Sequence, residues 1–180
     1  MAITRAELVE LIRQTGISKF KDRETPGGGE EVLFSVATET YRDRDGDPCV
    51  LLVARLEESG EYFKLFAPLA YKVVGANVAA MLKVCMIIQW QTKFFQFEYD
   101  AGDGEIRPVI EFPLEDATLT LKQFRRCVGA LLQLVEKYHP VFRRAIDAGV
   151  VDFGVGEDDE IRRLQAALEE AKRRKAAGGQ

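Results

Sequence analysis

The chain has 180 residues, of which 47% are hydrophobic and 30% charged, and its formal net charge is -4. These values predict one ordinary domain with a buried core, and the mild acidity argues against broad binding to nucleic acids or anionic membranes. A single histidine and three separated cysteines exclude most metal centres and most acid–base catalysis. Without a signal-peptide pattern or an uncharged apolar run of about 18 residues, a cytoplasmic protein is expected.

The N-terminal third of the chain is expected to form one helix and three strands. Residues 4–15 have the helical pattern, with Thr4 and Glu7 spaced as a capping box. The hydrophobic period then changes to two, which predicts strands at residues 32–37, 49–57 and 61–67 with turns between them. Short turns between successive strands indicate an antiparallel meander.

Residues 77–91 form the most apolar segment, and they are predicted to be a helix that is apolar on every side. Such a helix is buried on nearly all sides, either in the core of its own chain or against a second copy. Both interpretations stay open from the sequence. If the helix pairs with a second copy, the expected contact residues are Met81, Val84, Cys85 and Ile88.

The C-terminal half is expected to add a hairpin and a long helix. Strands are predicted at residues 94–99 and 105–114, followed by a helix over residues 118–138 that Pro140 kinks or restarts through Ala148. Residues 157–180 begin with acids and end with bases, and their i,i+4 ion pairs indicate a helix. The predicted domain therefore covers residues 1–154, with a charged helical tail at residues 155–180.

The element order, helix–three strands–helix–two strands–helix, predicts an α+β fold in which helices cover a twisted antiparallel sheet, with a charged C-terminal helix added. This pattern resembles the type III secretion chaperone-like fold, and in particular the YbjN family. The resemblance rests on the apolar helix at 77–82, the aromatic strand at 94–100, the segment 111–115 and the helix end at 138–142. It implies a non-enzymatic, commonly dimeric protein that binds extended protein segments or acts as a regulator.

The residues themselves point away from catalysis and from bound metal. Cys127 and His139 are the one pair that could supply a nucleophile and a base, but twelve helical residues separate them by about 18 Å. The Asp43–Asp47 stretch has its glycine one place too early for a calcium loop, and its twelfth position is Ala54. No catalytic residue, metal or cofactor is therefore predicted.

The remaining hypothesis is a protein–protein interaction module, chaperone-like or regulatory, that acts as a homodimer. Several strands carry apolar residues on both faces, so a face without helices would offer a partner-binding surface. The residues expected on that surface are Leu33, Leu51, Val53, Phe63, Leu65 and Phe94. Two alternatives stay open: a small-ligand sensor with a pocket between sheet and helices, and a nucleic-acid accessory factor that uses the basic cluster at Lys172–Lys175.

Overall fold

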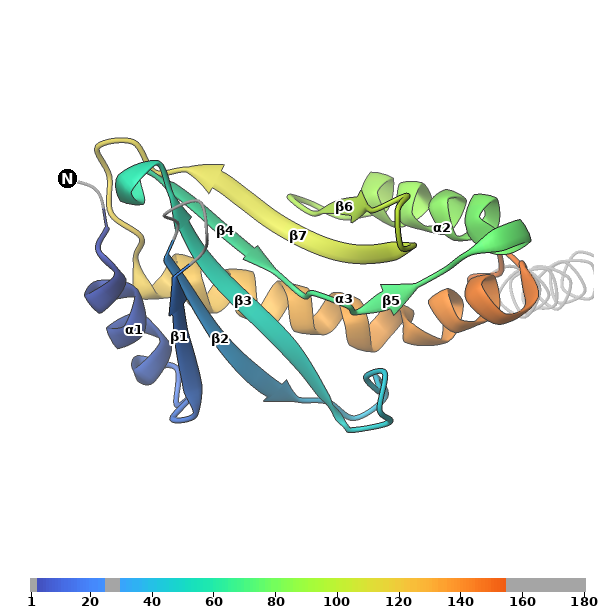
Figure 1. Cartoon of the computed structure of the whole chain (residues 1–180), viewed down its shortest axis with the longest axis horizontal. Helices are drawn as coiled ribbons and strands as arrows, with labels where there is room; N and C mark the ends of the chain where they lie inside the picture. The colour runs from blue at the N-terminus through green and yellow to red at the C-terminus, as the bar shows by residue number, and fades with distance from the viewer. Residues whose placement is uncertain (1–2, 25–29, 155–180) are drawn as a thin grey trace, which may run out of the picture.

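The computed structural model describes residues 3–24 and 30–154 of the chain; the predicted charged tail and its basic cluster lie outside this part. Within it, three α-helices and one seven-stranded antiparallel sheet form an α+β fold, which confirms the predicted class (Figure 1). The helices are α1 (Arg5–Gln14), α2 (Val78–Gln91) and α3 (Leu121–Ala148). The strands are β1 (Phe20–Glu24), β2 (Glu30–Ala37), β3 (Cys49–Glu57), β4 (Tyr62–Phe66), β5 (Tyr71–Lys72), β6 (Gln96–Tyr99) and β7 (Glu105–Pro113).

The sheet is built around β7, which has neighbours on both sides. β1, β2, β3 and β4 follow one another, and β4 pairs with residues 109–113 of β7. β5 pairs with the first residues of β7 on the same side as β4, whereas β6 pairs with residues 106–109 on the other side. Residues 110–113 of β7 therefore have a strand partner on one side only, among the residues that the structure describes.

Two strands, β1 and β5, were not predicted. The sequence of β1, Phe-Lys-Asp-Arg-Glu, has no apolar alternation, and β5 has only two residues. Both form because a neighbouring strand has backbone groups that they can pair with. A local pattern of side chains does not show that such a neighbour is present.

The helix ends follow the capping signals of the sequence. Thr4 and Glu7 form the predicted capping box of α1, and Thr120 and Gln123 form another at the start of α3. α3 then continues as one helix of 28 residues, with Pro140 inside it. Pro140 is exposed, so the carbonyl group that it leaves without a helical donor can be hydrated.

The core lies between one face of the sheet and the helices, since α3 runs across the back of the sheet in Figure 1. The ring of Phe124 in α3 packs 6.2 Å from that of Phe63 in β4 and 6.3 Å from that of Phe34 in β2. Each large apolar side chain buried here contributes roughly 1.5–3 kcal/mol of transfer free energy. The opposite face of the sheet is not covered by a helix in the described part of the chain.

Candidate interaction surfaces

The uncovered face of the sheet carries two adjacent rows of side chains, one apolar and one charged. The apolar row crosses four strands through direct cross-strand partners: Leu33, Val53, Phe66 and Val109. The charged row runs beside it through the next outward-facing positions: Glu31, Arg55, Lys64 and Glu111. Cross-strand neighbours on one face interact directly, so the register decides what each row contacts.

The charged row covers the apolar row. Phe66, Val53 and Val109 are almost fully buried although no helix lies above them. The guanidinium carbons of Arg55 and Arg107 lie 5.1 and 4.9 Å from the centre of the Phe66 ring. Long basic side chains can bury their alkyl stems on apolar groups while the charged ends stay near water.

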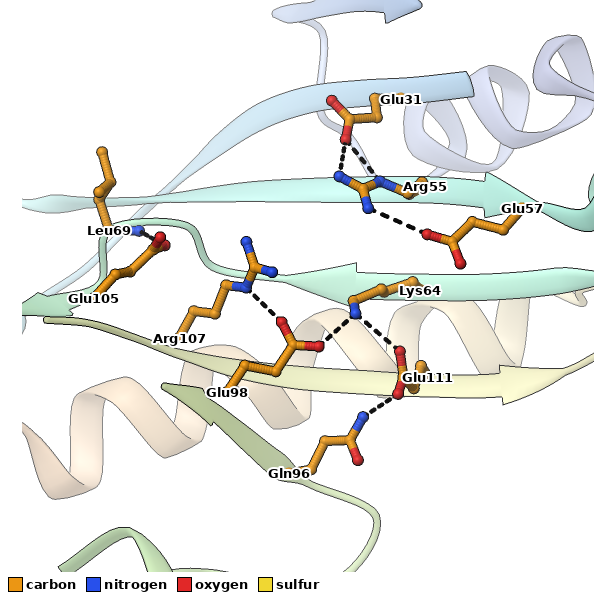
Figure 2. Close-up of polar contacts among 10 residues, drawn as sticks. All are labelled: Glu31, Arg55, Glu57, Lys64, Leu69, Gln96, Glu98, Glu105, Arg107 and Glu111. Atoms are coloured by element: carbon orange, nitrogen blue, oxygen red, sulfur yellow. Dashed lines mark hydrogen bonds and ion pairs between the residues drawn. The ribbon is translucent and has the colours of Figure 1, made fainter. Parts of the chain in front are cut away.

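The charged ends are held in a network of ion pairs (Figure 2). Arg55 pairs with Glu31 and, at 3.2 Å, with Glu57. Figure 2 also shows Lys64 between two carboxylates, with its Nζ 2.5 Å from Glu98 and 3.1 Å from Glu111. Arg107 Nε donates to the second oxygen of Glu98 at 2.6 Å, and Gln96 donates to Glu111.

The pKa shifts in this network show that the pairing outweighs burial. Burial alone would raise the pKa of Glu98, but the hydrogen bonds from Lys64 and Arg107 hold it below its ordinary value. Burial likewise disfavours the charged form of Lys64, but its bonds to Glu98 and Glu111 raise its pKa. A partner that covered this face would have to desolvate charges that are already paired, which is costly.

The six predicted partner-binding residues are divided among three places. Leu33, Leu51 and Val53 project from the uncovered face, where only Leu51 has a substantial exposed fraction, 37%. Phe63 and Leu65 project from the opposite face into the core and are fully buried. The sequence-based prediction placed all six residues on one surface. Alternate residues of a strand face opposite sides, so Phe63 and Leu65 lie on the face opposite Lys64, which α3 covers.

The sixth residue, Phe94, lies in the turn between α2 and β6 and is 49% exposed. It lines a groove of about 480 Å³ between the unpaired edge of β7 and the first turns of α3. We call it the β7 groove; it is lined by Lys93, Phe94, Phe112, Gln123, Arg126 and Cys127. The groove is mainly apolar, with the cationic groups of Lys93 and Arg126 exposed around it.

The four predicted dimer contacts, Met81, Val84, Cys85 and Ile88, are buried in the core of their own chain. They lie on the inner side of α2, as expected if this side of the helix is buried in the core of its own chain and not against a second copy.

The outer side of α2 is also apolar. Met86 is 56% exposed and Trp90, four residues later, is 90% exposed, with Leu82 half-buried one turn before Met86. We call Leu82, Met86 and Trp90 the outer stripe of α2. The outer stripe was not predicted from the sequence, because apolar residues all around a helix do not indicate which side is exposed.

The cysteine and the histidine considered for catalysis have separate structural roles. Cys127 faces the core side of α3, and burial raises the pKa of its thiol to about 11. His139 packs edge-on against the ring of Tyr41 at 5.1 Å. Burial, followed by the charge of Arg143, lowers the pKa of His139. A buried protonated thiol without a nearby base is a packing group.

Two further observations concern residues 3–24 and 30–154 only. None of their helices has the length and apolar character needed to cross a membrane. Their His, Cys, Asp and Glu side chains form no cluster of three or more that could hold a metal ion.

The fold and these surfaces define an α+β protein with a charged sheet face, an exposed apolar stripe on α2 and a mainly apolar groove beside β7. No family model matches the sequence, and no curated protein matches it. Among solved structures, the chain is similar to a chain in the crystal structure of the ExsC–ExsE complex, with 18% sequence identity and a TM-score of 0.49. The likeness covers 82% of this chain and 99% of that chain.

Proposed function

We propose that the protein is a non-enzymatic protein–protein interaction module that works as a homodimer in the cytoplasm. The observation that carries this proposal is the exposure of three large apolar side chains in and just after α2: Met86 is 56% exposed, Trp90 90% and Phe94 49%. A cluster of large exposed apolar side chains marks an interaction surface more often than a solvated one. Cys49, Cys85 and Cys127 are free thiols, as is usual in a reducing compartment.

The occupant of the outer stripe of α2 is a second copy of α2. Lys83 is the single charged residue among the 14 residues of this helix, so the stripe offers a partner almost no charge to pair with. A two-fold axis across the stripe would place each stripe against its own copy, and such an isologous contact needs only one self-complementary surface. Two Trp90 rings would then be removed from water.

Trp90 is the one tryptophan of the chain, so tryptophan fluorescence measures whether this side chain is buried in a dimer. Light scattering on the full chain should give twice the subunit mass of 20.2 kDa, and Trp90 fluorescence should shift to shorter wavelength as concentration rises. Trp90→Glu should yield a monomer, whereas Leu51→Glu on the uncovered sheet face should leave the dimer intact. A 20.2 kDa mass at all concentrations, with fluorescence of an exposed tryptophan, would overturn the dimer.

The β7 groove is the proposed site for a different occupant, an extended segment of a partner protein. Among the described residues, no strand pairs with residues 110–113 of β7 on the groove side, so an added strand can pair with their backbone groups. Phe94 and Phe112 then offer apolar contacts to alternate side chains, and Lys93 and Arg126 favour an acidic residue in the segment. Binding of this kind is chaperone-like, as the resemblance to the YbjN family implies. Membership of that family is part of the proposal.

A library of displayed 12-residue peptides tests the groove directly. We expect the full chain to enrich peptides with apolar residues at alternate positions and an acidic residue nearby, and binding should protect the amides of residues 110–113 from exchange. Phe94→Ser should abolish the enrichment and Arg126→Glu should reverse the charge preference, while Leu51→Ser serves as the matched control. Equal enrichment by the Phe94→Ser and native chains would contradict the groove assignment.

A further inference from the structure

A second pocket, unrelated to the surfaces above, opens at the other end of α3. Its volume is about 540 Å³, within the range of small-molecule sites. Three segments that are distant in sequence form its walls: the loop at residues 42–46 after β2, residues 69–72 leading into β5, and two successive turns of α3. In Figure 1 the loop after β2 reaches the region below β5 and α3. About 20 Å along α3 separates this pocket from the β7 groove.

The loop that forms one wall is fixed to α3. The carboxylate of Glu136 accepts hydrogen bonds from the backbone N–H groups of Glu39 and Thr40, both at 2.7 Å. Tyr41 is buried beneath the loop, and its hydroxyl donates to the carbonyl of Ala70 at 3.2 Å. These contacts join the loop, α3 and the segment before β5, so the pocket exists without a ligand and binding needs little ordering.

Four cationic side chains line the pocket, and they come from all three walls: Arg42, Arg44, Lys72 and Arg143. The Nη1 group of Arg42 donates to the carbonyls of Glu39 and Tyr41, both at 2.8 Å, which fixes the guanidinium plane and leaves its other donors available. Within the described part of the chain, Arg44 has no ion-pair partner.

Three carboxylates also line the pocket, those of Asp43, Asp45 and Asp103. Asp43 accepts the N–H groups of Asp45 at 3.0 Å and Asp47 at 2.8 Å, and Asp103 accepts that of Glu105 at 2.9 Å. Two of the three are thus engaged in closing their own turns. The pocket lining has four cations against three acids, in a chain whose formal net charge is -4. Two of the cations are already paired, because Lys72 Nζ lies 3.8 Å from Asp103 and Arg143 lies 2.6 Å from Asp147, so an anion would compete with these carboxylates for them.

Two polar atoms at this pocket have no hydrogen-bond partner in the described part of the chain. Tyr71 and His139 both line it, and the Tyr71 hydroxyl and His139 Nδ1 are buried without a hydrogen bond to any described residue. A buried hydroxyl donor such as that of Tyr71 is costly to leave without an acceptor, so the residues beneath the pocket have unused hydrogen-bonding capacity.

We propose that this pocket binds a small, multiply charged anion bearing a phosphoryl group, held by Arg42, Arg44, Lys72 and Arg143. Guanidinium groups match the geometry of phosphoryl oxygens through paired hydrogen bonds. A multiply charged anion is favoured over chloride because the cations converge from separate walls and several can contact it together. Such a site would allow a small anion to act on the chain independently of its protein partners.

Inorganic pyrophosphate is the probe, titrated into the full chain and followed by calorimetry and backbone amide NMR. The amide shifts should centre on residues 42–46, 69–72 and 139–143. Arg44→Ala and Arg143→Ala should each weaken binding about tenfold, as expected for a lost charge-assisted hydrogen bond. Arg13→Ala, an exposed arginine on α1, is the matched control and should leave affinity unchanged.

Thermal unfolding of each variant without pyrophosphate separates loss of the site from loss of the fold. An equal weakening by Arg13→Ala and Arg44→Ala would show diffuse attraction and overturn the proposal. Amide shifts outside the three walls, or no binding of pyrophosphate by the folded native chain, would overturn it as well. None of these results would affect the dimer or the β7 groove, whose residues are different.

Discussion

The uncovered sheet face and the outer stripe of α2 both contain large apolar residues but present different surfaces. On the sheet face, Phe66, Val53 and Val109 lie beneath Arg55, Lys64 and Arg107, and little apolar surface reaches water. On α2, Lys83 is the one charged residue, and Trp90 of the outer stripe is 90% exposed. An uncovered apolar residue marks an interaction surface only where no long charged side chain lies over it.

The largest effect on stability is expected at Phe63, which was predicted to bind partners but lies in the core. Phe63→Ala should lower the free energy of unfolding by about 3–5 kcal/mol, because it leaves a cavity against Phe124. Urea denaturation measures this. Leu51→Ala, on the uncovered face, should change stability far less, and equal losses from the two substitutions would contradict the assignment of the two faces.

A smaller loss is expected from removing the central cation of the charged row. Lys64→Met should destabilise the fold by about 1.5–3 kcal/mol, since it leaves the carboxylates of Glu98 and Glu111 without the amine that separates them. Adding Glu111→Gln should restore part of the stability, which denaturation of the single and double variants would show. Full stability in Lys64→Met alone would mean that the network is incidental.

The same network predicts how stability depends on pH. The folded pKa of Glu98 is lowered, so its contribution is present above its ordinary pKa of 4.5 and is lost as pH falls through the folded value. The folded pKa of Lys64 is raised above 10.5, so its contribution is lost as pH rises through that value. Glu98→Gln should therefore have a flatter unfolding profile below about pH 4.5. Parallel profiles for the two chains would contradict the lowered pKa.

The smallest effect on stability is expected at the outer stripe of α2. Trp90→Ser removes a side chain that contacts little in its own subunit, so monomer stability should stay within about 0.5 kcal/mol at a concentration where the chain is monomeric. Denaturation and light scattering of one sample would separate folding from association. A loss of several kcal/mol would place Trp90 in the fold and not in an interface.

Much of the architecture could be predicted from local patterns, whereas the site could be predicted only in part. The capping box at Thr4 and Glu7 predicted the start of α1, and the period of two predicted five of the seven strands. β1 and β5 lack such a pattern. Of the predicted partner-binding residues, Phe94 lies in an exposed groove, while Phe63 and Leu65 face the helices and Leu33 faces the uncovered side, a difference that their strand pattern does not show.

The sequence by itself determined the α+β class, which residues of a strand share a face, and the apolar character of α2. These properties depend on residue period and capping chemistry along the chain. Tertiary structure decided which face of each strand α3 covers and which side of α2 stays exposed. It also aligned Glu31, Arg55, Lys64 and Glu111 across four strands. Which face is covered and which side chains are aligned depend on contacts between segments distant in sequence. The local sequence pattern of a strand or helix would be the same if those contacts formed on its other side.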